Sequence, residues 1–416
     1  MGDLLKNRAF SAVWLAQASS ALGGTFATFI ISWLVYELSG SKMAMGSIWI
    51  TFMVPSLLTT LLAGPYLDRF DRKKIMILSE WVRAGVFLVP LILYPLGLLN
   101  VWHLYVVAAI MGIAEPLFRP TSMAYVAQIL PKDRLLKGNS FLEGTMQLMM
   151  LIGPALGGLL MSVLGIVPVL AFLVTCMAVS GFVLLFIPSS KKRVASKKKE
   201  TWFVQFKAGL KFYRLYPVLF WIGILLMVSN FSSGAAMPMF LPFVLDHLGG
   251  NEFQYGLFMS AFPLGMLLGS LVTGTFEQPK NLRRVMLGSL WMGGALLALL
   301  GWVPTYWLAL IVVMFSGFFA MVFTINNTTF YQKRVPDEIR GRVFAVRTLL
   351  AQSGMPLGAA FGGFFAEMWS LTALFTLLGI LSMITITIAW FQKVFYHLND
   401  EVADDDQVPL QVAVPK

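Results

Sequence analysis

Residues 64–74 read GPYLDRFDRKK, and this stretch decides the fold because a dense group of charges directly follows an apolar run. Two acids and four bases fall within residues 68–74, whereas 58% of the 416 residues are hydrophobic and 12% are charged. A soluble domain carries roughly 25% charged residues. The composition therefore predicts a membrane protein with several spans, and the charged stretch predicts a loop at the membrane surface.

Long apolar stretches, each near the ~20 residues that cross the hydrocarbon core, recur about twelve times along the chain. They predict an all-α polytopic membrane protein with twelve transmembrane helices. The first stretch continues to about Tyr36, which is too long for a signal peptide, so we expect it to remain as a span. The predicted spans lie near residues 9–36, 43–66, 75–97, 103–127, 138–163, 166–187, 217–245, 253–276, 285–303, 305–331, 342–366 and 371–396.

Basic residues gather on one side of these spans. With the N-terminus inside, the large majority of the 31 Lys and Arg residues lie in cytoplasmic loops, and Lys42 lies alone in the outer loops. This bias predicts a multi-pass protein with both termini in the cytoplasm. It also explains the net charge of +11, so we expect no nucleic-acid partner. Cys176 is the single cysteine, so disulfides cannot hold the fold.

A long polar stretch at residues 189–216 divides the chain into two halves. We expect an N-terminal six-helix bundle over residues 1–188, a C-terminal six-helix bundle over residues 217–397 and an acidic cytoplasmic tail over residues 398–416. The second part of the linker is basic and amphipathic, which fits either a helix on the inner leaflet or a solvated loop. The tail is predicted to be disordered.

The two halves also read as copies of one another. The segment GPYLDRFDRKKIM from Gly64 aligns with GTFEQPKNLRRVM from Gly274, with glycine on glycine and a basic pair on a basic pair. Two six-helix bundles in pseudo-two-fold parallel repeat, joined by a cytoplasmic linker, are the arrangement that a rocking transporter requires. The repeat therefore predicts a transporter.

The stretch at residues 64–74 resembles the signature loop of the major facilitator superfamily, which has a Gly, then Asp-Arg, then a basic cluster. Its D-R-x-D-R form is similar to the drug:proton antiporter branch that contains macrolide-type exporters. The resemblance implies a latch that holds the cytoplasmic side closed. Gln278 replaces the acid in the second half, so we expect a one-sided latch. The implied latch residues are Gly64, Asp68, Arg69, Asp71 and Arg72.

The fifth span also resembles drug:proton antiporters. Residues 150–159 read MLIGPALGGL, close to the glycine-rich pattern G-x-x-x-G-P-x-x-G-G, with Met149 in place of the first Gly. The resemblance implies an exporter. Small residues allow helices to pack closely, and the proline favours a bend. The residues expected in these roles are Gly153, Pro154, Gly157 and Gly158.

Charged residues inside the spans are candidates for the coupling chemistry, because a charge near mid-bilayer costs at least ~2.5–3.5 kcal/mol unless it is paired or hydrated. Glu115 lies in the fourth span with Arg119 one turn further along, and spans three and five add Glu80, Arg83 and Glu143. Three acids face two bases, so one carboxyl lacks a full partner. We expect Glu115 to carry a proton and Arg119 to control its release. The alternative is that these ion pairs are structural clamps between helices.

Polar but uncharged side chains in the spans are expected to hydrogen-bond the substrate. Phe and Met side chains would complete an adaptable, mostly apolar cavity. The predicted cavity residues are Gln17, Asn230, Ser233, Asn326 and Asn327.

The sequence also lacks the motifs of membrane enzymes. Its three histidines fall near span ends, and it contains neither a Cys/His metal-ligand spacing nor a phosphate-binding glycine loop. We therefore expect no enzyme activity, no catalytic residues, no metal site and no cofactor, with the proton gradient as the driving force.

These observations favour proton-coupled efflux of hydrophobic or amphipathic, drug- or macrolide-like molecules by alternating access. A lysophospholipid flippase, a siderophore exporter and a proton-coupled sugar symporter stay open as alternatives on the same fold. The expected partners are membrane lipid, the small-molecule substrate and protons. The resemblance implies a monomer in the inner (plasma) membrane of a bacterium.

Overall fold

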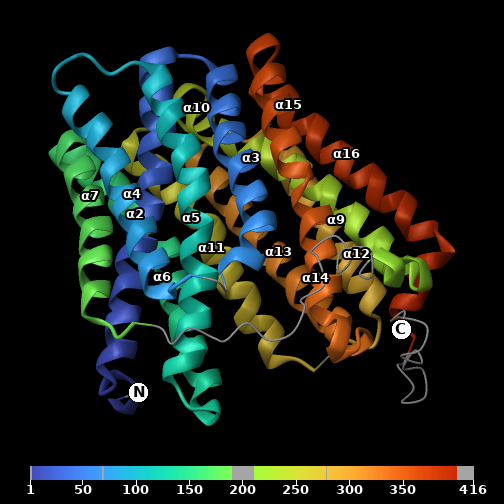
Figure 1. The fold of residues 1–416 in the computed structure, drawn as a ribbon. Helices are drawn as coiled ribbons and strands as arrows, with labels where there is room; N and C mark the ends of the chain where they lie inside the picture. The colour runs from blue at the N-terminus through green and yellow to red at the C-terminus, as the bar shows by residue number, and fades with distance from the viewer. Residues whose placement is uncertain (1, 68–69, 190–209, 278, 401–416) are drawn as a thin grey trace. The chain divides into compact units, whose positions relative to one another are not determined.

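The computed structural model describes residues 2–67, 70–189, 210–277 and 279–400, and these ranges are built from helices with no strand among them (Figure 1). The predicted all-α architecture is therefore confirmed. Most of the predicted linker and nearly all of the predicted tail lie outside the described residues. The expectations for those two segments stay predictions.

The first half of the chain forms a series of long helices. It begins with the short α1 (Gly2–Leu5) and ends in a 3-10 turn, η1 (Leu184–Phe186). The long helices are α2 (Arg8–Ser39), α3 (Lys42–Leu67), α4 (Arg72–Leu93), α5 (Val101–Ile129), α6 (Lys132–Leu164) and α7 (Ile166–Val183).

The second half repeats the series with one irregular stretch. After α9 (Pro217–Ala236), the chain passes through η2 (Met237–Met239), α10 (Phe240–Pro242) and the π-helical turn η3 (Phe243–His247). The remaining helices are α11 (Glu252–Thr275), α12 (Leu282–Leu300), α13 (Tyr306–Arg334), α14 (Asp337–Gln352), α15 (Gly354–Met368), α16 (Leu371–Phe391) and the 3-10 helix η4 (Lys393–Leu398).

Eleven of the described helical segments are long and apolar enough to cross a membrane. The twelfth predicted span, near residues 342–366, is formed by α14 and α15, which are separated at Ser353. The chain packs tightly just after this break, because a Cβ at Gly354 would lie 3.0 Å from the backbone nitrogen of Phe231 on α9. Among the described residues, eleven segments therefore have the length and composition of a span, and the predicted twelfth is divided between α14 and α15.

The chain divides into two compact units. One comprises Met1–Lys197 with Phe240–Ser260, and the other comprises Lys198–Met239 with Ala261–Lys416. Residues 240–260 come after the predicted linker in the sequence, but they pack with the residues that come before it. This segment carries η3 and the first part of α11.

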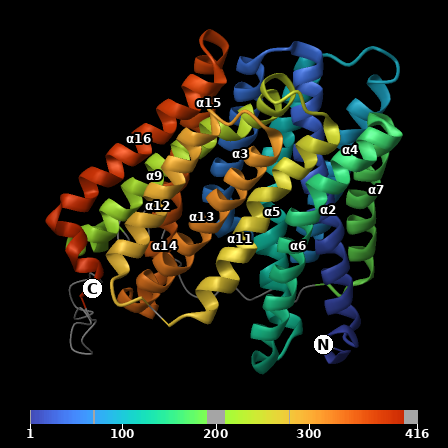
Figure 2. The ribbon, with the colours of Figure 1, turned by 180° about the vertical axis from the view of Figure 1, so that it is seen from behind.

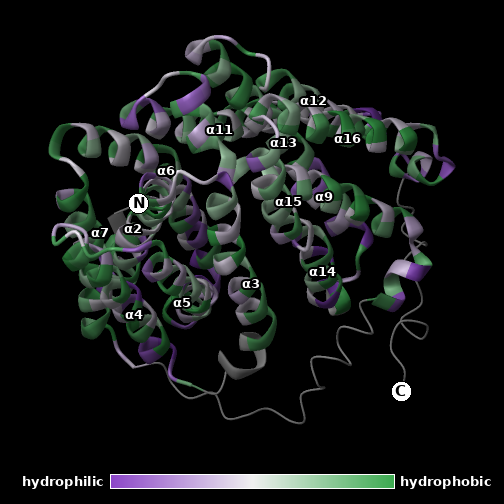
Figure 3. Cartoon of the chain, turned by 90° about the horizontal axis from the view of Figure 1, so that it is seen from above, coloured by the Kyte–Doolittle hydropathy of each residue, from purple (hydrophilic) through white to green (hydrophobic). Residues whose placement is uncertain are grey.

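In the first unit, α2 packs against α5, α6 and α7, and α4 packs against α5 and α7 (Figure 3). α3 packs on α5. Their close approach depends on Gly112, because a Cβ there would lie 3.2 Å from the Cβ of Pro55 and would overlap the Phe52 carbonyl. The arrangement brings polar side chains of α2, α4 and α5 to one buried place.

In the second unit, α9 packs against α14, α15 and α16, while α12 packs against α13 and α16. α11, α12 and α13 can be followed together in Figure 2. A buried apolar core joins Phe323 and Tyr331 on α13 to Val343 on α14 and Leu219 on α9.

Candidate functional site

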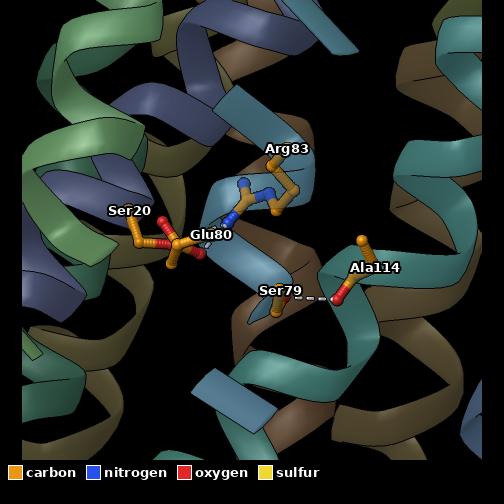
Figure 4. Close-up of polar contacts among 5 residues, drawn as sticks. All are labelled: Ser20, Ser79, Glu80, Arg83 and Ala114. Carbon is orange, nitrogen blue, oxygen red and sulfur yellow. Dashed lines mark hydrogen bonds and ion pairs between the residues drawn. The ribbon is translucent and has the colours of Figure 1, made fainter. Parts of the chain in front are cut away.

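The centre of the candidate site is an ion pair buried in the first unit. Glu80 and Arg83 lie one turn apart on α4, and Arg83 Nη1 lies 2.6 Å from Glu80 Oε1 (Figure 4). Their side chains are 0% and 2% exposed, respectively. Such a pair is strongly destabilised when one partner is lost, because the remaining charge has no water to solvate it.

Ser20 on α2 hydrogen-bonds to both members of this ion pair. Its hydroxyl donates to Glu80 Oε1 at 2.9 Å and accepts from Arg83 Nη1 at 2.7 Å (Figure 4). Ser79, beside Glu80, donates to the carbonyl of Ala114 on α5 at 2.7 Å. These bonds fix α4 against α2 and against the turn of α5 that carries Glu115.

Glu115 belongs to this cluster. Its carboxylate interacts electrostatically with Arg83 and with Glu80. Within the described chain, Glu80 Oε2 and Arg83 Nε are buried and have no hydrogen-bond partner. The half-buried Glu115 therefore adds a second carboxyl group to the buried Glu80–Arg83 pair, whose hydrogen bonds are incomplete.

Arg119 lies in a second cluster. Its Nη2 donates to both carboxylate oxygens of Glu143 on α6, each at 2.7 Å. These two side chains are 50% and 36% exposed. We expected Arg119 to act on Glu115, one turn away on the same helix. The structure pairs it with Glu143 instead, because a guanidinium that binds both oxygens of one carboxylate gains two charge-assisted hydrogen bonds.

The expected cavity residues make different contacts. Gln17 is buried between α2 and α5, where its Oε1 accepts from Ser122 at 3.2 Å and its Nε2 has no partner among the described residues. Asn230 on α9 donates to the Ala351 carbonyl at 2.9 Å, which ties α9 to α14. Ser233 stays exposed. The neighbouring Ser232 is buried and bonds to Ser382 on α16 at 3.0 Å.

The two adjacent asparagines of α13 are both buried. Asn326 donates from Nδ2 to the Val322 carbonyl of its own helix at 2.8 Å. Neither amide atom of Asn327 has a hydrogen-bond partner in the described part of the chain. A buried amide without hydrogen-bond partners is costly.

The glycine-rich face of α6 is a packing surface, and α6 is continuous through Pro154. A Cβ at Gly153 would lie 2.8 Å from the Cβ of Thr25 on α2, and one at Gly157 would lie 3.7 Å from the ring of Phe29. Gly158 faces α11, where its added Cβ would lie 3.1 Å from the Cα of Gly256. These glycines therefore let α6 approach α2 and α11 closely.

Two further contacts join residues 240–260 to the first unit. The backbone N–H of Ala155 on α6 donates to the hydroxyl of Ser260 at 3.1 Å. The rings of Phe29 and Tyr255 stack with their centroids 5.1 Å apart. These contacts and the glycine approach hold the first part of α11 on α2 and α6.

The charged stretch that follows α3 anchors the start of α4. Asp71 accepts from the backbone N–H of Lys73 at 2.9 Å and so caps α4, while Arg72 donates to the Ala124 carbonyl of α5 at 2.9 Å. Lys73 Nζ donates to two carbonyls at the end of η1, those of Leu185 and Ile187. Gly64 lies in the last turns of α3. The other expected latch residues, Asp68 and Arg69, lie outside the described residues, so the latch stays a prediction.

The sequence interpretation missed two residues. Ser20 is one of many serines in apolar runs and gave no signal, whereas Arg347 is a charge inside a predicted span and could have been found. Its guanidinium lies over the ring of Tyr331, 4.8 Å from the centroid, and over the ring of Phe344 at 5.3 Å. It therefore joins α14 to α13.

Comparisons with known proteins agree with this architecture. The family model described as transmembrane secretion effector matches residues 4–413. The chain is 24% identical over 379 residues to macrolide efflux protein A of Streptococcus pyogenes, a match that covers 89% of this chain and 93% of that protein. It is 26% identical over 396 residues to the multidrug efflux pump Tap of Mycolicibacterium fortuitum, covering 91% and 94%. It is 23% identical over 390 residues to the staphyloferrin A transporter of Staphylococcus aureus, covering 91% and 93%.

Solved structures share the fold at low sequence identity. A bacterial homologue of the iron transporter ferroportin, in an inward-facing state, aligns with a TM-score of 0.71 at 14% identity, covering 95% of this chain and 99% of that one. A bacterial homologue of the lysosomal transporter Spinster aligns with a TM-score of 0.70 at 14% identity, covering 94% and 96%. The predicted transporter fold is therefore confirmed.

Proposed function

The chain belongs to the transmembrane secretion effector family of the major facilitator superfamily, and from this premise we propose that it exports hydrophobic or amphipathic small molecules in exchange for protons. It is a multi-pass membrane transporter, and its relatives are bacterial, which supports the plasma membrane as its location. Two of these relatives are named as a macrolide efflux protein and a multidrug efflux pump. Their names support export of drug-like cargo.

Proton exchange is supported by one observation: a second carboxyl group, that of the half-buried Glu115, interacts electrostatically with the buried Glu80–Arg83 pair. With a proton on Glu115, the Glu80–Arg83 pair is neutral overall. Loss of that proton leaves one uncompensated negative charge in the cluster. An excess buried charge is costly, so proton release requires either hydration of the cluster or a compensating cation.

This requirement can couple cargo to protons. A cationic amphipathic cargo near the first unit would offset the negative charge that deprotonated Glu115 leaves. Departure of the cargo would then favour renewed protonation of the same carboxyl group. Cargo and proton would bind in alternation, which is the condition for antiport.

Transport in energised inverted membrane vesicles tests the proposal, with a fluorescent hydrophobic cation and a macrolide as cargo. We expect uptake that collapses with a protonophore and falls at least tenfold in Glu115→Gln. Glu37→Gln is the matched control, because Glu37 accepts from Tyr94 at 2.7 Å at the far end of α2. Uptake in Glu115→Gln equal to that of the wild type would exclude Glu115 as the proton carrier.

Siderophore export is the second candidate, because one relative is named as the staphyloferrin A transporter. A siderophore with several carboxylates would be repelled by deprotonated Glu115, in contrast to a cationic drug. The two candidates therefore differ in the sign of the cargo charge. Competition of fluorescent-cation uptake by cationic drugs, but not by an anionic siderophore, would support the first candidate.

A further inference from the structure

A groove of about 600 Å³ opens in the second unit. It lies between the last turns of α11, the first turns of α12 and the second half of α13, three helices that are seen together in Figure 2. Its apolar wall includes Val272, Phe276, Val285, Phe318, Val322 and Ile325.

Glycines explain where the groove begins. α11 and α13 touch backbone to backbone near Gly269, where an added Cβ would lie 2.6 Å from the carbonyl oxygen of Phe318. Beyond Gly269, α11 carries the larger side chains of Val272 and Phe276, and these side chains line the groove. On α12, a Cβ added to Gly288 would meet no atom within 4 Å, so this wall of the groove is open. Phe276 is 74% exposed at the mouth.

The groove is about as long as one membrane leaflet is thick. Along α13 its lining runs from Phe318 to Thr329, which corresponds to about 16 Å at a rise of 1.5 Å per residue. The hydrocarbon core of a bilayer is about 30 Å thick, so one leaflet contributes about half of that. An acyl chain from a single leaflet fits this apolar length.

Two opposite charges line the same groove. Arg284 stands in the first turn of α12 and Glu277 follows the end of α11, and both side chains are exposed. In the described part of the chain, neither the guanidinium nor the carboxylate has a hydrogen-bond or ion-pair partner. An unpaired guanidinium suits a phosphate group, and an unpaired carboxylate suits an ammonium group.

We propose that this groove binds a phospholipid of the cytoplasmic leaflet whose headgroup carries a primary amine, as in phosphatidylethanolamine. The acyl chain lies along α13, the phosphate is held by Arg284 and the ammonium is held by Glu277. A headgroup that carries both charges matches Arg284 and Glu277 better than a purely anionic headgroup, which Glu277 would repel. The site is independent of the exported cargo.

Photo-crosslinking in nanodiscs tests the site directly. The full-length protein is reconstituted with phosphatidylethanolamine that carries a diazirine in its acyl chain, and labelled peptides are mapped by mass spectrometry. Phosphatidylglycerol and phosphatidylcholine probes with the same chain are run in parallel. We expect label on residues 272–276 and 318–329, at least fivefold stronger from the ethanolamine lipid than from the other two.

Variants separate the parts of the proposal. Gly288→Leu fills the groove and should reduce the label at these residues at least tenfold. Gly293→Leu is its matched control, because Gly293 lies on the same helix, has no atom within 4 Å of an added Cβ and does not line the groove. Glu277→Gln should weaken labelling by the ethanolamine lipid alone, and Arg284→Gln should weaken labelling by every phospholipid.

Equal labelling in Gly288→Leu and Gly293→Leu would overturn the site. Equal labelling by the three lipids, unchanged in Glu277→Gln, would overturn the headgroup assignment. Arg284 and Glu277 are exposed, so their variants keep the packing of the unit and test the proposal even if Gly288→Leu fails to fold.

Discussion

Arg119 on α5 binds both carboxylate oxygens of Glu143 on α6, whereas Glu115, one turn away on α5, interacts electrostatically with the Glu80–Arg83 pair. The Arg119–Glu143 pair is balanced in charge and largely exposed, whereas the Glu80–Arg83 pair is buried and the half-buried Glu115 adds a second acid to it. The two clusters therefore have different expected roles. We expect the exposed pair to join two helices and the cluster around Arg83 to hold the exchangeable proton.

Glu143→Gln should leave proton-coupled uptake within about twofold of the wild type, because an exposed ion pair contributes about 0–1 kcal/mol and carries no excess charge. Glu115→Gln should reduce the same uptake at least tenfold. The measurement is protonophore-sensitive transport in inverted vesicles at equal protein content. If Glu143→Gln is the more defective of the two variants, the proton is carried by the exposed pair and our assignment is wrong.

Arg83→Met should destabilise the protein by about 3–5 kcal/mol, because it leaves the buried Glu80 without its charged partner. The double variant Glu80→Gln with Arg83→Met removes both charges and should recover a large part of this loss. Thermal unfolding of the purified protein in detergent measures both effects. A double variant no more stable than Arg83→Met would show that the ion pair is not the source of the loss.

Ser20→Ala should cost about 1–3 kcal/mol, because the hydroxyl donates to Glu80 and accepts from Arg83 in a buried place. Ser162→Ala is a suitable comparison, since that hydroxyl is exposed and bonds to the Leu159 carbonyl of its own helix. Its effect should stay within about 0.5 kcal/mol. Equal unfolding temperatures for the two variants would argue against a role for Ser20 in the cluster.

The spans could be predicted from the sequence because an apolar run of about 20 residues in a membrane must satisfy its backbone hydrogen bonds internally, which a helix does. The charges Glu80, Arg83 and Glu115 could be predicted as a site for the same reason, since each is costly inside a span. The interruption at Ser353 could not be predicted. It accompanies the close packing of Gly354 on α9, which no local pattern specifies.

The pairing of charges between helices could not be predicted from the sequence either. Arg119 and Glu115 lie one turn apart on α5, and helical spacing alone favours their contact. The structure directs Arg119 to α6 because the rotation of each helix is set by packing, as at Gly153 against Thr25. Ser20 was missed for the same reason, because its position relative to Glu80 depends on how α2 and α4 face each other.

Gly158→Ala should loosen the contact between α6 and α11, because the added Cβ would lie 2.5 Å from the Glu252 carbonyl oxygen. Overpacking of this kind typically costs about 1–3 kcal/mol. Gly144→Ala on the same helix is the control, since its Cβ would meet no atom within 4 Å. We expect faster amide hydrogen exchange in residues 252–260 for Gly158→Ala alone. Unchanged exchange in that segment would mean that the glycine contact does not hold α11.

Tyr36→Phe should release the π-helical turn η3 from the end of α2, because the Tyr36 hydroxyl donates to the carboxylate of Asp246 in that turn. A hydrogen bond to a charged group contributes about 1.5–3 kcal/mol, so amide hydrogen exchange in residues 243–248 should become faster by at least tenfold. Asp246→Asn should give a smaller effect, since the amide oxygen still accepts the hydroxyl without the charge. Tyr94→Phe makes the same chemical change at a bond to Glu37, outside residues 240–260, and should leave that segment as slow as in the wild type. Equal acceleration in both tyrosine variants would mean that the exchange reports general loosening of the first unit, and the Tyr36–Asp246 bond would then have no specific role in holding η3.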